Sequence, residues 1–259
     1  MSKVFIEEAT LTGIADAIRG KEGSEALVPV TEMAERIGAL SGESPLVAHA
    51  KTIQLHSLND LGRSVAEVSL PKATSISNFC SLNLNYRVPE LVNATVEELT
   101  LRCGSPITTA GSFLTVSNYN IDNCLTKLML YADLSRVANL SQFLNNMRAL
   151  THIGGEALDF SAATNLASAF SRLDELRELR FQGSIQANLS VKDSTLLSKD
   201  SIRSLLPCLS DTVSGKTLTL SLQAVDTAFE TAEGAADGSS SAEWTALVDS
   251  KPNWTISLV

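Results

Sequence analysis

A short apolar motif recurs through the middle of the chain. It consists of an apolar residue, two variable positions, a second apolar residue, one variable position and a third apolar residue. Four full copies and one shortened copy are present: Val65–Leu70, Val96–Leu101, Leu125–Leu130, Leu176–Phe181 and, shortened, Leu150–Ile153. Such alternation is typical of a short strand with one buried side. An aromatic residue follows at Phe79, Phe113, Phe143 and Phe170. The apolar motif and the aromatic residue recur together, which predicts one structural unit repeated along the chain.

The segments between the motifs predict the rest of the unit. About 20 residues must turn and return so that the next strand can stack in parallel on the previous one. Apolar residues with helical spacing occur in two of these segments, at Leu140, Phe143 and Leu144, and at Leu166, Phe170 and Leu173. The expected fold is therefore an α/β repeat: a leucine-rich-repeat-like solenoid with parallel strands on one face and short helices on the other.

Two short amphipathic helices are predicted before the repeats. Leu11, Ile14 and Ile18 share one face of the first, and Met33 and Ile37 share one face of the second. Such short helices must bury their apolar stripes against each other, against the repeats or against another chain. Pairing within the chain and docking to a partner remain open alternatives. Breakers within 41–49 indicate a linker, so residues 1–44 form a predicted attachment or oligomerisation segment.

The last 60 or so residues predict a different unit. Helices are expected at 200–209 and 242–248, and strands at 217–222 and 254–258, with a mobile loop rich in Gly, Ala and Ser at 233–241. An open end of a strand array invites aggregation unless a capping unit covers it. We therefore divide the chain into 1–44, a repeat domain at 45–198 and a C-terminal cap at 199–259.

Composition and charge disfavour several classes of function. The formal net charge of −9 disfavours a general nucleic-acid binder, which needs a basic field. No stretch is apolar enough for a secretory signal or a membrane span, so we expect synthesis in the cytoplasm and no membrane insertion. Four cysteines, Cys80, Cys103, Cys124 and Cys208, match no zinc or redox spacing and are interpreted as small apolar core residues.

Candidate catalytic groups are few. The three histidines, His49, His56 and His152, accompany neither a nucleophile elbow nor a phosphate-binding loop, and surface histidine is the favoured interpretation. Glu97 and Glu98 are adjacent on a predicted strand, so they point to opposite faces and cannot readily flank one bond. No calcium-type loop occurs. The expectation is a protein that is not an enzyme and uses no metal or cofactor.

The variable positions of the motif are the candidate binding residues, because stacked strands align them into columns on one sheet face. Arg102, Tyr131 and Arg180 are favoured, since arginine and aromatic side chains supply bidentate hydrogen bonds and large contact area. Lys127 and His152 occupy further variable positions. The alternative is that this face is merely solvated or is covered by a neighbour.

The repeats resemble a known family. Val65-x-x-Val68-x-Leu70-Pro71, then Ser75-Ile76, then Asn78-Phe79-Cys80, is similar to the leucine-rich repeat of bacterial surface adhesins, over roughly residues 63–182. The third unit is similar to a sister variant through Val137 and Phe143. The chain departs from the pattern at the ladder asparagine, which is replaced by Ala73 and Gly104. Backbone groups at that turn must then be satisfied in another way.

The two ends carry a second resemblance. Leu11-Thr-Gly-Ile-Ala-Asp-Ala-Ile-Arg-Gly-Lys-Glu-Gly23, then Val28-Pro-Val and Met33-Ala-Glu-Arg-Ile37, resembles the opening of tail and baseplate-associated proteins of phages and prophages of gut-type bacteria, and the order of C-terminal elements is similar too. The resemblance implies a non-enzymatic virion component that contacts other tail proteins and a host-surface protein or glycan. It also implies a symmetric homo-oligomer, such as a trimer. A packing module inside the tail and a bacterial surface adhesin are the alternatives.

Overall fold

The computed structural model describes residues 46–47, 65–82, 96–116, 125–232 and 234–259. By its contacts the chain divides into two units, Met1–Pro45 and Leu46–Val259, and every described residue belongs to the second. The predicted N-terminal helices, with Leu11, Ile14, Ile18, Met33 and Ile37, lie outside the described residues. So do His49, His56 and Cys124.

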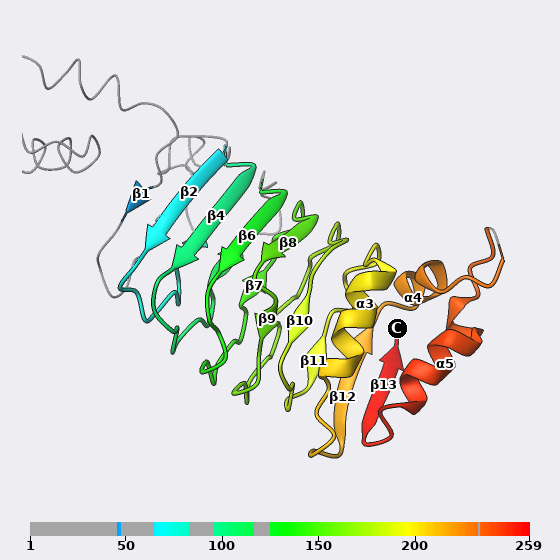
Figure 1. Cartoon of the computed structure of the whole chain (residues 1–259). Helices are drawn as coiled ribbons and strands as arrows, with labels where there is room; N and C mark the ends of the chain where they lie inside the picture. The colour runs from blue at the N-terminus through cyan, green and yellow to red at the C-terminus, as the bar shows by residue number, and fades with distance from the viewer. Residues whose placement is uncertain (1–45, 48–64, 83–95, 117–124, 233) are drawn as a thin grey trace, which may run out of the picture. The chain divides into compact units, whose positions relative to one another are not determined.

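A five-stranded parallel sheet, the broad sheet, organises the first part of this unit (Figure 1). Its strands follow one another in chain order: β1 (Leu46–Val47), β2 (Val65–Leu70), β4 (Glu98–Cys103), β6 (Lys127–Tyr131) and β8 (His152–Gly155). The strands predicted from the motif at Val65, Val96 and Leu125 are confirmed, although the second and third begin two residues late. The register aligns equivalent motif positions between β4 and β6, for example Leu101 with Leu130. Between β2 and β4 it is offset by two residues, so that Val68 pairs with Leu101.

The fourth full motif behaves differently. Instead of a strand over Leu176–Phe181, the chain forms an isolated parallel bridge between His152 and Glu178, and then the two-residue strand β10 (Phe181–Gln182). β10 pairs with β9 (Leu158–Asp159) rather than with β8. The regular ladder is interrupted because residues 154–157 intervene between the two pairings.

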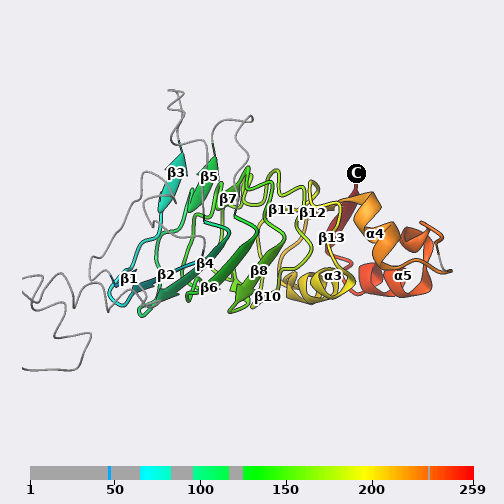
Figure 2. The same ribbon diagram turned by 90° about the horizontal axis from the view of Figure 1, so that it is seen from above.

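The short helices expected at 140–144 and 166–173, on the opposite side of the units, are a wrong prediction. A second parallel sheet forms there, from β3 (Cys80–Leu82), β5 (Leu114–Val116) and β7 (Leu144–Asn145), as Figure 2 shows from above. The amides at 140 and 144 donate to the next unit, at Asn165 O (2.9 Å) and Ala169 O (2.7 Å), and not to their own helical turn. Gln142 and Ser168 also have φ near +53°, which no right-handed helix permits. The helical spacing therefore marks inward-facing residues of a bent chain.

The aromatic residues form a continuous spine through the core. Phe79, Phe113, Phe143 and Phe170 are fully or almost fully buried, as the motif predicts. Ring centroids lie 5.6 Å apart between Phe79 and Phe113, 5.2 Å between Phe113 and Phe143, and 6.4 Å between Phe143 and Phe170. Two rings outside the predicted set, Phe160 and Phe181, extend the spine. Aromatic packing thus joins successive units beneath both sheets.

The turn that lacks the ladder asparagine is satisfied by the backbone. Ala73 and Gly104 both donate their N–H groups to Leu70 O, at 3.3 and 3.1 Å. A Cβ at position 104 would lie 2.8 Å from the Pro71 backbone, so only glycine fits there. A polar ladder occurs further along the unit instead. The side chains of Ser75, Asn139 and Asn165 each accept the amide two residues on.

The C-terminal segment carries the predicted mixture of helices and strands. It contains α3 (Lys199–Leu205), a 3-10 turn at Leu206–Cys208, β12 (Lys216–Leu220), α4 (Leu222–Ala228), a 3-10 turn at Gly238–Ser240, α5 (Ala242–Asp249) and β13 (Trp254–Leu258). β12 lies between β13 and the earlier β11 (Leu189–Ser190) in a parallel sheet. Helix α4 was not predicted, because the expected strand was extended to residue 222.

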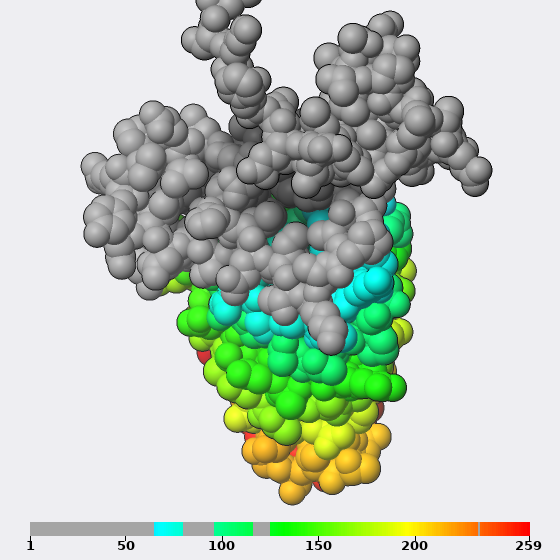
Figure 3. Space-filling view, turned by 90° about the vertical axis from the view of Figure 1, so that its left-hand side faces the viewer, coloured from blue at the N-terminus to red at the C-terminus, as the bar shows by residue number. Residues whose placement is uncertain are grey.

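One hydrophobic core runs through the described residues, from Ala66 to Trp254. Viewed from the β2 end, the described surface shows successive bands in chain order (Figure 3). Cys103 and Cys208 pack against this core, as predicted for small apolar residues. Burial, assisted by the charge of Glu156, raises the pKa of the Cys103 thiol to about 12, and burial raises the pKa of Cys208 as well. No helix in the described part of the chain is long and apolar enough to cross a bilayer.

Candidate functional site on the broad face

The broad face is the outward side of the broad sheet, and strand alternation decides which residues lie on it. Buried residues such as Leu99, Leu101, Leu128 and Leu130 point inward, and the intervening positions point out. The outward positions are Val65, Glu67 and Ser69 on β2, Glu98, Thr100 and Arg102 on β4, Lys127, Met129 and Tyr131 on β6, and His152 and Gly154 on β8. Val65 is 61% exposed, although the motif predicts a buried residue there. Parallel register aligns these positions into rows across the strands.

Arg102 is held between two neighbouring strands. Its Nε donates to Glu67 Oε1 at 2.7 Å on β2, and its guanidinium lies 4.0 Å from the centre of the Tyr131 ring on β6. The hydrogen bond to Glu67 raises the pKa of the Arg102 guanidinium, against the smaller opposing effect of burial. The three side chains therefore form a diagonal row across three strands, in which the arginine has one defined position.

A second row contains alternating charges. Glu98, Lys127, His152 and Glu178 are paired in sequence by the strand register. Lys127 Nζ lies 3.4 Å from Glu98 Oε2, and His152 Nδ1 lies 2.8 Å from Glu178 Oε2. Exposed pairs of this kind contribute little to stability. Their effect here is to restrict side-chain positions on the face.

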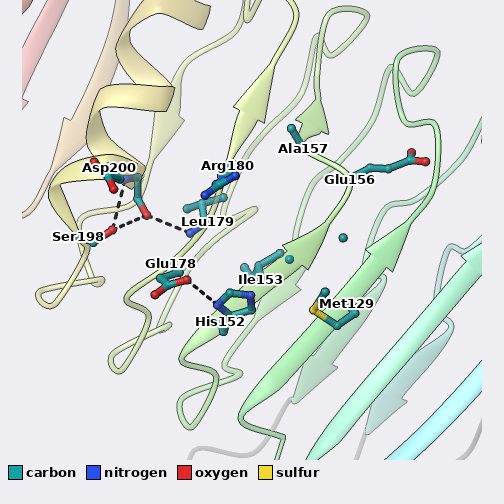
Figure 4. Close-up of a pocket in the computed structure, with 13 residues that line it drawn as sticks. Met129, His152, Ile153, Glu156, Ala157, Glu178, Leu179, Arg180, Ser198 and Asp200 are labelled. Carbon is teal, nitrogen blue, oxygen red and sulfur yellow. Dashed lines mark hydrogen bonds and ion pairs between the residues drawn. The ribbon is translucent and has the colours of Figure 1, made fainter.

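A hollow of about 430 Å³ opens where the repeat is interrupted (Figure 4). In the figure, Met129 and Glu156 lie on one side and Ser198 and Asp200 on the other, with His152, Glu178 and Arg180 between them. The remaining lining residues are Ile153, Gly154, Gly155, Ala157, Leu179 and Ser201.

Two glycines and a change of hydrogen-bond partner create the hollow. Gly155 stands where the other motifs have their third apolar residue; its φ is +92°, and a Cβ there would lie 2.3 Å from Leu130 O. Glu156 N–H still donates to Leu130 O at 2.8 Å, whereas Leu158 N–H donates to Arg180 O at 2.8 Å. The chain thus remains hydrogen-bonded to β6 as far as Glu156 before Leu158 bonds to the next unit. The ladder between these two units is therefore interrupted between Ile153 and Leu158.

Helix α3 closes the far side of the hollow. Ser201 Oγ accepts the Leu179 amide at 3.0 Å and donates to Arg177 O at 3.2 Å. Ser198 is the N-cap of α3, and its Oγ lies 2.9 Å from Ser201 Oγ. Serine side chains thus replace the strand partners that residues 177–179 would have in a continuous sheet, which fixes this wall without a further strand.

All five predicted binding residues lie on the broad face or at the hollow. Arg102 and Tyr131 are in contact, Lys127 and His152 are neighbours in register, and Arg180 lines the hollow together with His152. The sequence placed Glu67 among the variable positions of this face without indicating its contact with Arg102, and it gave no indication of Glu178 or of the hollow. The available signal was the shortened motif Leu150–Ile153, which is followed by two glycines.

Among the described residues, no three His, Cys, Asp or Glu side chains gather in a way that could hold a metal ion. With its pKa raised to about 12, the Cys103 thiol is protonated near neutral pH and is a poor nucleophile there. Comparison of the chain with protein-family models, with curated proteins and with solved structures gave no match.

Proposed function

We propose that the chain is a non-enzymatic, phage tail-tip or baseplate-associated protein that binds a host-surface molecule through the broad face. In this proposal the stacked units are a leucine-rich-repeat-like solenoid, residues 199–259 cap it, and residues 1–44 attach the chain to other tail proteins or to copies of itself. The virion assignment rests on the resemblances at the two ends of the sequence.

The observation that carries the binding role is the Glu67–Arg102–Tyr131 row. An arginine held at 2.7 Å by a carboxylate and stacked at 4.0 Å on an aromatic ring has lost much of its rotamer freedom before any ligand arrives. Preorganised arginine and tyrosine side chains are the residue types that dominate binding interfaces. A sheet face that only contacts solvent would gain little from holding these three side chains in fixed positions.

Particle adsorption tests the proposal. The variant R102A/Y131A/R180A, carried by assembled particles, is expected to reduce adsorption to host bacteria by about tenfold or more, because it removes one ordered contact pair and the arginine at the hollow. All three side chains are outward-facing or partly exposed, so folding should be retained and is checked by circular dichroism.

The matched control is K72A/R136A, which removes two exposed cations from the turns instead of the broad face. Adsorption should remain at the wild-type level. If the triple variant adsorbs as well as the control, the broad face does not bind the host, and the packing-module alternative is favoured. Loss of particle assembly in the triple variant would identify the face as a contact within the tail.

A further inference from the structure

We propose that the hollow at the repeat break binds one neutral sugar residue of a surface glycan. The inference rests on the proposed host-surface function and specifies its ligand class. It concerns the space bounded by His152, Gly154, Glu156, Arg180 and Asp200, which is separate from the Arg102–Tyr131 contact.

The size of the hollow suits a small ligand. Its volume of about 430 Å³ falls within the roughly 300–1,000 Å³ that is typical of small-molecule sites. Gly154 lies at the floor, and the side chains of His152 and Met129 lie over it: a Cβ at position 154 would lie 2.6 Å from His152 Nε2 and 2.9 Å from Met129 Sδ. Glycine at this position lets these two side chains cover the floor, so a ligand ring would meet them rather than the backbone.

The charges around the hollow favour a ligand that is uncharged and rich in hydroxyl groups. Glu156, Glu178 and Asp200 place three carboxylates at its walls, which disfavours an anion. Arg180 faces the same space and makes no ion pair within the described residues, which disfavours a simple cation. A hydroxyl both donates and accepts, so adjacent hydroxyls can bond to a carboxylate and to a guanidinium at once.

The rest of the lining complements the carbon side of a sugar ring. Met129 and Ala157 contribute apolar surface beside these polar groups, whereas the side chains of Ile153 and Leu179 are buried in the core. The lining is thus mixed, with polar and apolar surface in similar amounts, and its polar groups would orient the ligand. Methionine also adapts its shape to a ligand at small cost.

The polar walls are fixed before a ligand binds. His152 Nδ1 is engaged by Glu178 at 2.8 Å, so its Nε2 is the ring nitrogen that remains at the floor of the hollow. On the far wall, Ser201 binds the Leu179 amide and Ser198 contacts Ser201. Such preorganisation reduces the entropic cost of binding.

Saturation-transfer NMR on the full chain tests the ligand class. The probes are methyl glycosides of neutral hexoses, 6-deoxyhexoses and N-acetylhexosamines, with methyl glucuronide and free amino acids as the anionic and zwitterionic panels. At least one neutral glycoside should receive saturation from the wild-type protein. Methyl glucuronide should give no signal, because its carboxylate would meet the three carboxylates at the walls. The amino acids test the competing occupant, since a zwitterion can pair with Arg180 and with a carboxylate at once.

Two variants locate the binding. G154A displaces His152 and Met129 from the floor, because its Cβ would lie 2.6 Å from His152 Nε2 and 2.9 Å from Met129 Sδ, and R180A removes the donor. Each should raise the dissociation constant of the bound glycoside by about tenfold or more. The matched controls are G111A, whose new Cβ would meet its nearest neighbour at 3.6 Å, and R177A, an exposed arginine outside the lining. Both controls should bind as the wild type does. R180A keeps the test valid if G154A disturbs folding.

The alternative results are distinguishable. If no neutral glycoside binds while particles still adsorb through the broad face, the inference fails and the proposed function stands. If adsorption also proves independent of the broad face, both fail. Binding of amino acids that is lost in G154A would replace the sugar by a zwitterion. A glycoside signal unchanged in both variants would place the site elsewhere and overturn the inference.

Discussion

The strand stack, residues 65–182, and the C-terminal segment, residues 199–259, satisfy their backbone groups in different ways. In the stack, amides donate to the neighbouring unit, as Ile107 N–H does to Asp133 O at 2.9 Å and Leu114 N–H to Phe143 O at 3.0 Å. In the C-terminal segment, three helices bond within themselves and begin at serine caps, Ser198, Ser221 and Ser241.

Stabilising hydrogen bonds in the stack are therefore shared between units, whereas those in the C-terminal segment are largely local to each helix. A unit of the stack satisfies some turns itself, as Ala73 N–H does with Leu70 O, but takes many of its backbone partners from the neighbouring unit, so a change in one unit is felt by the next. A capped helix carries part of its own stabilisation, and what it needs from elsewhere is a place to pack. Three predictions test this contrast, beginning with the largest effect.

The largest loss is expected from F143A in the stack. Phe143 is fully buried and its ring contacts Phe113, Phe160 and Phe170, so the cavity would interrupt the spine between units. The free energy of unfolding, measured by urea denaturation, should fall by about 3–5 kcal/mol. The control L222A, at a side chain 42% exposed, should change it little. A wild-type-like transition for F143A would contradict the burial of this ring.

An intermediate loss is expected from K251M in the C-terminal segment. The buried Lys251 Nζ donates to Leu209 O at 2.8 Å, to Pro207 O at 3.3 Å and to Asp211 Oδ1 at 3.0 Å, and so joins the connection between α5 and β13 to the 3-10 turn after α3 and the residues that follow it. Methionine keeps the aliphatic volume but leaves these acceptors without a donor.

The free energy of unfolding of K251M should fall by about 1–3 kcal/mol in the same urea assay. The control K216M removes a lysine that makes no ion pair within the described part, and it should be nearly neutral. Equal losses in K251M and K216M would show that the three bonds do not stabilise the segment.

The smallest effect concerns pH and the junction between the two regions. Burial opposes ionisation of Asp193, but hydrogen bonds from Lys192 Nζ and the Arg172 amide, both at 2.8 Å, outweigh it and lower the pKa of this carboxyl. A carboxyl with a depressed folded-state pKa stabilises the protein above its ordinary value of 3.8, and this contribution is lost as the pH falls through the folded-state value.

The wild type should therefore be more stable than D193N at neutral pH, and the difference should shrink as the pH is lowered below about 3.8. Unfolding curves of both proteins across the acidic range measure it. The control D174N removes a more exposed carboxylate, 3.7 Å from Arg148, and should show a smaller pH-dependent difference. A constant gap between wild type and D193N at every pH would argue against the ionised carboxylate as the stabilising form.

The two regions also differ in how far the sequence predicted them. Strand alternation identified β2, β4 and β6, and the phase of the phenylalanines identified buried positions such as Phe113 and Phe143, because both depend on local spacing. Helical spacing at Leu140, Phe143 and Leu144 gave a wrong helix. A bent chain with left-handed residues at Gln142 and Asn146 brings the same positions inward, and periodicity cannot distinguish the two.

The candidate site was predicted only in part. Strand alternation placed Arg102, Tyr131 and Lys127 on the outward side, because that property is local. Glu67 contacts Arg102 across 35 residues of sequence, and such a pairing depends on register, which the motif spacing does not fix. The hollow depends on a change of hydrogen-bond partner after Ile153. In the sequence, that change is visible only as the shortened motif Leu150–Ile153.

The pairing of β13 with β12 has a consequence for folding during synthesis. β13 leaves the ribosome after every other described element, yet Trp254 donates its indole N–H to Ser210 O at 2.9 Å and five residues of β13 complete the ladder on β12. Until then, the nascent chain would hold the finished stack, and the side of β12 (Lys216–Leu220) on which β13 later pairs would have no strand partner. Premature termination before Trp254 would preserve almost every unit and still leave a template for aggregation.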